Sequence, residues 1–386
     1  MSAAKRTPLS GPEMVALSKR HTMTEWSAQA AANPIPIARA KGSWFWTPEE
    51  EKFLDFNSQL MCTNIGHGDE RVLKAITDQA ATLAYANPFM ATEPRARLGA
   101  KLAEICPGDI DAFFFTNGGA EAVENAFRIA RLYTGRHKIA ARYRSYHGGT
   151  SGALSATGDP RRWFAEPGMP GIFRIPDFHE FGAAEPRPVA EVLAETEKII
   201  RFEGPQTVAA IIVEPVVGTN GILVPPAGYL AGVREICDEH GIVWIADEVM
   251  AGFGRCGEWF AVDHWGVTPD LICFAKGVNS GYVPLGGVVI SAAIAESFEQ
   301  RAFPGGLTYS GHPLACASAV ASIRIFEEEG ILENVRTVSE PVIAPRLAEI
   351  AAAHPSVGEV RGLGFFWALE LVRDPQTREP LVPYNA

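Results

Sequence analysis

The chain has 386 residues, of which 47% are hydrophobic and 20% charged, so we expect a large packed core and no long disordered region. A formal net charge of −11 argues against a nucleic-acid surface, because phosphate contacts need clustered Lys and Arg. The six cysteines show no CxxC spacing, and no apolar run is long enough for a membrane span or a secretory signal. These features predict a cytoplasmic protein without a nucleic-acid or membrane partner and without a metal site.

The first part of the chain, residues 1–40, is expected to be an irregular arm because its prolines interrupt long elements. Beyond it, apolar runs and helical spacing alternate, with glycine or proline at the boundaries. The predicted strands are 44–46, 53–56, 112–115, 209–213, 242–246, 271–274 and 365–372. The predicted helices are 121–133, a helix opened by Pro188, a helix marked by residues 230–237, 315–329 and one near 341–353.

The alternation of strands and helices in the middle of the chain is typical of α/β proteins with a mostly parallel sheet covered by helices. Past residue 313 the pattern becomes helical and suggests a second, smaller domain. We therefore expect three regions: residues 1–65 as the N-terminal arm and part of the small domain, 66–313 as a large ligand-binding domain, and 314–386 as a C-terminal small domain.

Polar residues follow four of the predicted strands, at the sheet edge where open α/β folds bind ligands. Glu214 follows 209–213, Asp247 follows 242–246, and Lys276 comes two positions after 271–274. The segment Thr116-Asn-Gly-Gly-Ala-Glu121 follows the strand at 112–115 and opens a helix. Acids, a lysine and a glycine-rich helix start are thus expected to converge on one edge.

These residue types together indicate a pyridoxal-phosphate (PLP) site. A Gly-Gly turn at a helix N-terminus can cradle a phosphate with backbone N–H groups. A lysine in a partly apolar wall has a lowered pKa and can bond covalently to a carbonyl carbon. An aspartate deep in the same site can keep a pyridine nitrogen protonated. The combination fits PLP better than any other common cofactor.

From about residue 40 to 372 the sequence resembles the class III aminotransferases, with several motifs in the family's order. These motifs are Thr116-Asn-Gly-Gly-Ala-Glu-Ala122, Ser145-Tyr-His-Gly-Gly149, Ile245-Ala-Asp-Glu-Val-Met-Ala-Gly-Phe-Gly-Arg255, Asp270-Leu-Ile-Cys-Phe-Ala-Lys-Gly277 and Leu307-Thr-Tyr-Ser-Gly-His-Pro313. The resemblance implies the PLP-transferase fold of type I, with a mostly parallel seven-stranded sheet and a smaller α+β domain. It also implies a PLP-dependent aminotransferase that moves an amino group from a primary amine or ω-amino acid to a 2-oxo acid such as pyruvate.

The resemblance also assigns roles to single residues. Lys276 would bind the cofactor covalently and move a proton, and Asp247 would pair with the pyridinium. Val249 and Tyr146 would enclose the ring, and Glu214 would lie near the ring hydroxyl. The phosphate would be held by Gly118, Gly119 and Ala120 and, from the neighbouring subunit, by Thr308, which implies a homodimer with a tetramer left open. The substrate pocket would be lined by Leu60, Met61 and Phe89.

Three departures from the family's pattern concern cofactor affinity and the substrate. The phosphate turn has Ala120 where many members have a serine, and Met250 stands where many have a glutamine. Family chains usually continue beyond the strand at 365–372, into a segment that often supplies an arginine for the substrate carboxylate. We therefore expect an incomplete small domain at 314–386 and assign no such arginine.

Two other functions are compatible with these residues, and one motif suggests a different cofactor. A PLP-dependent aminomutase of the glutamate-1-semialdehyde type would use the same lysine, and a non-catalytic PLP-binding protein is a third alternative. Gly252-Phe-Gly-Arg-Cys-Gly257 matches a dinucleotide-binding fingerprint. That motif requires a helix to open within it, and the following residues show no helical face. His147 is expected to be a structural hydrogen-bonding residue, and Cys256 and Cys273 are expected to pack in the core.

Overall fold

The computed structural model describes residues 7–183 and 185–382, and its centre is a seven-stranded sheet with strand order β4-β10-β9-β8-β7-β5-β6. The strands are β4 (Ala112–Thr116), β5 (Lys138–Arg142), β6 (Ile172–Ile175), β7 (Val208–Val213), β8 (Val243–Asp247), β9 (Leu271–Phe274) and β10 (Gly286–Ile290). Five strands run parallel from β9 to β6, while β10 is antiparallel to both of its neighbours. The prediction of a mostly parallel seven-stranded sheet is confirmed.

Helices cover both faces of this sheet, because its strands are apolar on both sides. In β8, Trp244 and Ala246 belong to one core cluster and Val243 and Ile245 to the other. The first cluster includes residues of α4, α7, α8 and α10, and the second includes residues of α5, α6 and α9. These helices are α4 (Glu93–Ile105), α5 (Gly119–Thr134), α6 (Ser151–Ala156), α7 (Val189–Glu203), α8 (Tyr229–His240), α9 (Ala292–Glu296) and α10 (Pro313–Glu328).

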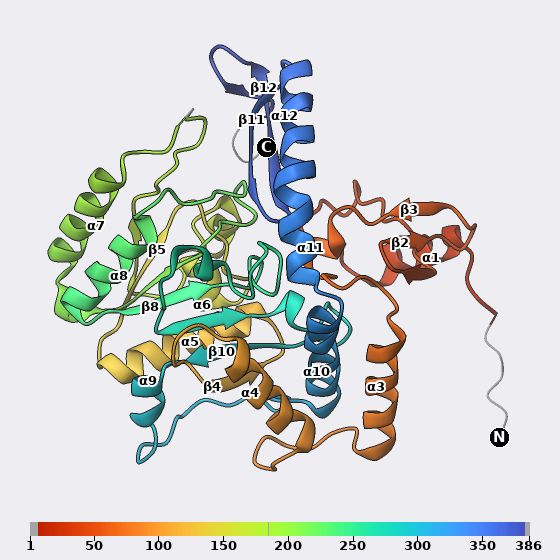
Figure 1. The fold of residues 1–386 in the computed structure, drawn as a ribbon, viewed down its shortest axis with the longest axis horizontal. Coiled ribbons are helices and arrows are strands. Elements are labelled where there is room, and N and C mark those ends of the chain that lie inside the picture. Colours follow the sequence, from red (N-terminus) through yellow and green to blue (C-terminus); the bar gives the residue numbers. More distant parts are fainter. Residues whose placement is uncertain (1–6, 184, 383–386) are drawn as a thin grey trace.

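Two small antiparallel sheets lie outside the central one. The N-terminal sheet consists of β1 (Arg39–Lys41), β2 (Trp44–Trp46) and β3 (Lys52–Leu54), and α2 (Ser58–Met61) and α3 (Glu70–Thr82) lead from it toward the large domain. The C-terminal sheet consists of β11 (Val357–Leu363), β12 (Phe366–Asp374) and β13 (Glu379–Pro380). It packs beside α12 (Ala344–Ala353), which continues the line of α11 (Ile331–Val338), as Figure 1 shows.

The prediction of a wholly irregular arm at 1–40 is wrong, because α1 (Gly11–His21) lies within it. Ser10 and Glu13 form a reciprocal capping box at the start of this helix. Pro12 lies in the first turn, where the missing N–H group has no helical partner in any case. The proline thus begins the helix and does not interrupt it.

The sequence patterns missed β1, β5, β6, β10, β11 and β13. These strands are short or atypical: β5 reads Lys-Ile-Ala-Ala-Arg, and β10 begins with two glycines. Residues 249–258, which carry the dinucleotide-like fingerprint, form turns and bends with no helix, as the sequence predicted. No helix within 7–183 and 185–382 is both long and apolar enough to cross a bilayer.

Candidate active site

A cavity of about 340 Å³ opens at the carboxyl ends of β7, β8 and β9, beside the start of α5. All the predicted cofactor-site residues except Thr308 line this cavity, namely Gly118, Gly119, Ala120, Tyr146, Glu214, Asp247, Val249 and Lys276. They come from five separate segments, and the sheet brings them together because parallel strands end at one edge. His147 and Met250 also lie in the wall.

The start of α5 forms one end of the cavity. Gly118 precedes the helix and provides no side-chain cap, so the first N–H groups of α5 keep their hydrogen-bonding capacity. A Cβ atom on Gly118 would project into open space, whereas one on Gly119 would come within 2.9 Å of the Val249 side chain. An anion can therefore approach the positive end of this helix without meeting a side chain.

Gly286 of β10 supports this turn from behind. A Cβ atom at position 286 would lie 2.8 Å from the backbone carbon and oxygen of Gly118. We predict that Gly286→Ala shifts the turn, weakens PLP binding at least about tenfold and lowers the free energy of unfolding by roughly 1–3 kcal/mol. Equilibrium titration of the apoprotein with PLP and chemical denaturation measure the two effects. Gly99→Ala is the control, because its methyl group would only make an ordinary 3.9 Å contact; unchanged PLP affinity in Gly286→Ala would contradict the prediction.

Asp247 ends β8 and is fixed by two hydrogen bonds. One carboxylate oxygen lies 2.7 Å from Nδ1 of His147, and the other accepts a hydrogen bond from the backbone N–H of Val249 at 3.1 Å. The side chains of His147 and Asp247 are 0% and 4% exposed. His147 was predicted to form structural hydrogen bonds, and its partner is Asp247. A buried carboxylate so held offers a strong, rigid acceptor for a cationic group in the cavity.

Glu214, directly after β7, ties two segments of the wall together. One of its oxygens accepts from the N–H of Tyr146 at 3.0 Å, and the other accepts from the N–H of Gly218 at 2.7 Å. Burial raises the pKa of Glu214, and nearby Asp247 adds to this shift, while His147 and the two N–H groups oppose it. The carboxyl group therefore holds the Tyr146 segment and can share a proton with groups in the cavity.

Lys276 follows β9 with a left-handed backbone conformation (φ +45°), which is rare for residues other than glycine. Burial lowers the pKa of its ammonium group, while Asp247, Cys62 and Glu214 act in the opposite direction. A lowered pKa increases the fraction of neutral amine, which is the nucleophilic form. The lysine is thus suited both to covalent bonding with a carbonyl carbon and to proton transfer.

Arg161 is a neighbour of the site that the sequence analysis missed. Its guanidinium lies 3.7 Å from the ring centroid of Tyr146. Asp159, which is 5% exposed, pairs with Arg161, and the hydroxyl of Thr219 accepts a further hydrogen bond from it at 2.9 Å. One face of the Tyr146 ring is therefore covered by an anchored cation, which restricts rotation of the ring.

Glu248 follows Asp247 and is fully buried, with one oxygen accepting from the N–H of Val262 and the other without a hydrogen-bond partner among the described residues. Burial raises its pKa to about 8 from an ordinary 4.5. Between these values the folded protein binds more protons than the unfolded chain, so the free energy of unfolding falls as the pH rises through this window. We predict that Glu248→Gln removes this fall and is more stable than the wild type at pH 8 by roughly 1–4 kcal/mol.

Urea unfolding of wild type and Glu248→Gln at pH 5.5 and pH 8 measures this linkage. Glu185→Gln, an exposed change of the same kind, should leave the pH dependence of the wild type unaltered. If the free energy of unfolding changes by the same amount between pH 5.5 and pH 8 in wild type and in Glu248→Gln, the raised pKa of Glu248 does not cause the change.

Other predicted residues lie outside the cavity of their own chain. Thr308 is exposed and its carbonyl accepts a hydrogen bond from the hydroxyl of Tyr85 at 2.8 Å. Leu60 and Met61 lie in a left-handed turn at 58–61, and Phe89 is 95% exposed. None of the predicted substrate-pocket residues is in the wall, whereas Trp26 and Cys62 are, and no sequence pattern had pointed to them.

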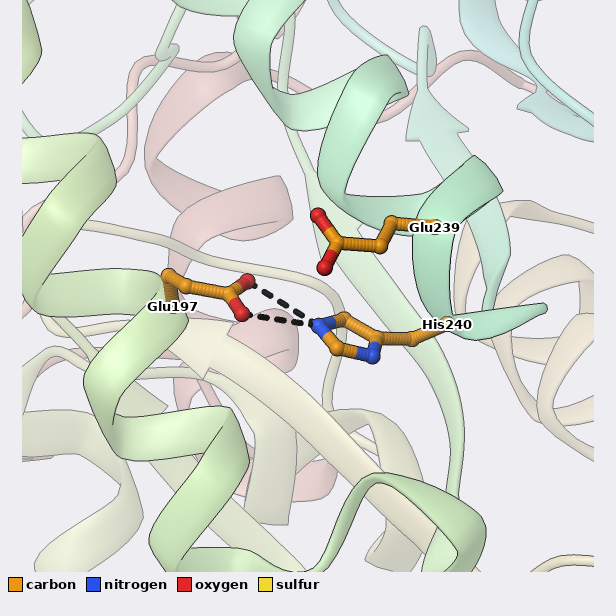
Figure 2. A group of neighbouring side chains, drawn as sticks. All are labelled: Glu197, Glu239 and His240. Atoms are coloured by element: carbon orange, nitrogen blue, oxygen red, sulfur yellow. Dashed lines mark hydrogen bonds and ion pairs between the residues drawn. The ribbon is translucent and has the colours of Figure 1, made fainter.

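A possible metal-ligand cluster lies away from this site, between the middle of α7 and the end of α8 (Figure 2). Glu197, Glu239 and His240 place ligand atoms within 4.8 Å of one another. Glu197 already bonds His240 Nε2 at 2.9 and 3.1 Å and pairs with Arg201, which also reaches Glu239 at 3.8 Å. Because the arginine neutralises these carboxylates, the cluster is explained as an ion-pair network linking the two helices.

Comparison with known proteins identifies the family. The family model described as "Aminotransferase class-III" matches residues 26–384. The chain belongs to the class III aminotransferases. A curated relative, putrescine–pyruvate aminotransferase of Pseudomonas aeruginosa, is 38% identical, and the alignment covers 95% of this chain and 84% of that protein. The chain is therefore a PLP-dependent transaminase, and the relatives, which are named aminotransferases, give no support to an aminomutase.

Solved structures of aminotransferases share the fold over nearly the whole chain. Taurine:2-oxoglutarate aminotransferase from Bifidobacterium kashiwanohense, solved in complex with PLP and glutamate, has a TM-score of 0.94 and 41% identity, with 99% of this chain and 87% of that chain covered. An (S)-enantioselective ω-transaminase from Thermomicrobium roseum has a TM-score of 0.92 and 38% identity, with 98% and 88% covered. The site has the features that PLP needs: an open helix start, a buried carboxylate and a half-buried lysine.

Proposed function

We propose that this aminotransferase moves an amino group from a primary amine or ω-amino acid to pyruvate or another small 2-oxo acid, with Lys276 and Asp247 as its catalytic residues. The observation that carries the proposal is the convergence of the buried Asp247, the half-buried Lys276 and the open start of α5 on one cavity. When bound, PLP supplies an electron-withdrawing pyridinium ring that acidifies the carbon next to the substrate nitrogen.

The chain's own residues have distinct tasks in this proposal. Lys276 would hold PLP covalently through Nζ and, once a substrate amine had taken its place, its amine would be the group that moves a proton in the site. Asp247 balances the charge of the pyridinium, and His147 holds Asp247 in place. Tyr146 and Val249, which line the cavity, would enclose the ring, and Glu214 would lie near its hydroxyl. Gly118, Gly119 and Ala120 bind the phosphate through N–H groups.

Apolar contacts are proposed to select the amine donor. Trp26, Met250, Val283, Pro284 and Leu285 contribute to the wall, whereas no arginine of the described residues does. Apolar surface of this kind favours amines whose carbon chain it can contact. Relatives that act on putrescine or taurine, by their names, fit the same class of terminal amine.

We further propose a cytoplasmic homodimer in which Thr308 reaches the phosphate of the neighbouring subunit, and in which Leu60, Met61 and Phe89 complete the substrate pocket. The exposure of Leu60 and Phe89 in the single chain supports this arrangement, because large apolar side chains are usually covered in the functional assembly, and Thr308 is also exposed. The six cysteines form no disulfide, as suits a reducing compartment. The boundaries of the three regions at 65 and 313 are proposals of the same kind.

A donor panel tests the proposed function. Purified PLP-loaded protein is mixed with putrescine, taurine, 5-aminovalerate, β-alanine or 1-phenylethylamine, each with pyruvate and with 2-oxoglutarate. Formation of alanine or glutamate is measured by chromatography, with Lys276→Ala as the blank. We expect at least one terminal amine to give product with pyruvate. Turnover of an amino acid without any 2-oxo acid, or no product with every pair, would contradict the proposal.

A further inference from the structure

A second cavity of about 320 Å³ lies between the N-terminal sheet, α11 and the turn at 254–255. Figure 1 shows β2 and β3, in orange-red, beside the blue helix α11 on this side of the molecule. The cavity shares no wall residue with the one that contains Lys276. Its wall is rich in small polar groups, including Ser43, Ser58, Thr63 and Asn64. Its volume suits a small polar molecule.

Arg255 lines this cavity and is 8% exposed. Its Nη2 donates to the side-chain oxygen of Asn64, while its Nε has no hydrogen-bond partner among the described residues. No carboxylate of those residues lies within ion-pair distance of Arg255. Burial lowers the pKa of this guanidinium, and the groups that oppose the shift are the thiols of Cys256 and Cys62.

A buried guanidinium without a counter-charge is costly, and buried charges in proteins are normally paired. The one acid in the cavity wall, Asp55, is already committed: its oxygens bind His67 Nε2 at 2.7 Å, the N–H of Gln59 at 3.1 Å and the hydroxyl of Thr63 at 3.4 Å. The positive charge of Arg255 therefore faces a polar cavity without a protein anion to balance it.

We propose that this cavity is a binding site for a small oxyanion, held by Arg255 and the polar side chains around it. The guanidinium is planar and presents several N–H donors, which match the oxygens of a carboxylate or of a similar oxyanion. Hydroxyl groups of Ser43 and Ser58 supply further donors within the wall. The site is distinct from the PLP site, so its occupant is not the reacting substrate.

Asn64 connects the proposed site with the catalytic lysine. Its amide donates to the carbonyl of Phe253 at 2.7 Å, and its Nδ2 lies so close to Gly277 that a Cβ there would approach within 2.5 Å. Gly277 is the residue after Lys276. Asn64 therefore links an anion bound at Arg255 to Gly277, the residue next to the catalytic lysine.

Equilibrium dialysis of the PLP-loaded protein tests the site, with the cofactor filling its own phosphate site. The probes are radiolabelled acetate, which is planar, and radiolabelled sulfate, which is tetrahedral. We expect one saturable equivalent per chain for at least one probe and an at least tenfold weaker affinity in Arg255→Gln. Arg346→Gln, the same change at an exposed arginine on α12, should bind like the wild type. Preference for one probe tells a carboxylate site from a sulfate- or phosphate-like one.

A second variant keeps the test decisive if Arg255→Gln does not fold. Asn334 is an exposed wall residue on α11, so Asn334→Glu adds a negative charge at the rim without disturbing the core. It should weaken anion binding severalfold, whereas Asn334→Gln should not. No saturable binding to the wild type, or unchanged binding in Arg255→Gln or Asn334→Glu, would overturn the proposal. Because the readout is binding, the result is independent of which amine the enzyme uses.

Discussion

Replacement of Lys276 by alanine is expected to lower the transamination rate by at least about 10⁴-fold. Proton transfer by a positioned group alone contributes roughly 10²–10⁴-fold, and the substitution also removes the covalent bond to the cofactor. The site offers no substitute, because no other lysine lines the cavity among the described residues. Steady-state rates with an active donor from the panel and pyruvate measure this loss.

Two further measurements separate chemistry from folding. Gel filtration after borohydride reduction should leave PLP on the wild type but not on Lys276→Ala, because only a lysine-linked cofactor is trapped. Lys74→Ala, at an exposed lysine of α3 paired with Asp78, is the matched control and should keep wild-type activity. Retention of more than a tenth of the activity by Lys276→Ala would rule out the proposed role.

The second large effect is expected for Asp247→Asn, with a rate roughly 10²–10⁴-fold below the wild type. Removing one partner of a buried ion pair costs about 3–5 kcal/mol. Asparagine keeps the size of the side chain and can still accept from Val249 N–H and bond His147, so the change tests charge and not packing. The rate of the first half-reaction, followed by cofactor absorbance under single-turnover conditions, is the appropriate measurement.

Asp78→Asn, the same change on the surface of α3, is the control for Asp247→Asn and should be neutral. Asp247→Glu should recover part of the rate, because it restores the charge although it shifts its position. If Asp247→Asn reacts as fast as the wild type while binding PLP normally, the charge of Asp247 is not part of the mechanism.

Much of the cofactor site could be predicted from the sequence because the residues follow strands. Glu214, Asp247 and Lys276 each come directly or two positions after an apolar run, and parallel strands end at one edge of the sheet. The glycine-rich start of α5 was recognisable for the same reason. The positions of these residues depend on the local order of strand, turn and helix. Patterns within short segments of the sequence predict that order.

The substrate side could not be predicted in this way. Trp26 and Cys62 come from the N-terminal region and reach the cavity only through the path of the chain before α3. Arg161 lies next to Tyr146 because Asp159 and Thr219 hold it there, and no spacing in the sequence expresses that contact. Such neighbours depend on how distant loops pack, so they appear only in three dimensions.

The sequence by itself determined the fold class and the placement of Lys276 and Asp247 at the sheet edge where the cavity lies, because hydrophobic periodicity and strand-end residues are local properties. The family resemblance came from short motifs, which are local as well. The tertiary structure alone decided that His147 holds Asp247 and that Arg255 is buried without an acidic partner among the described residues. Both depend on contacts between residues far apart in the chain. Burial, which shifts pKa values and creates the need for a counter-charge, exists only after folding.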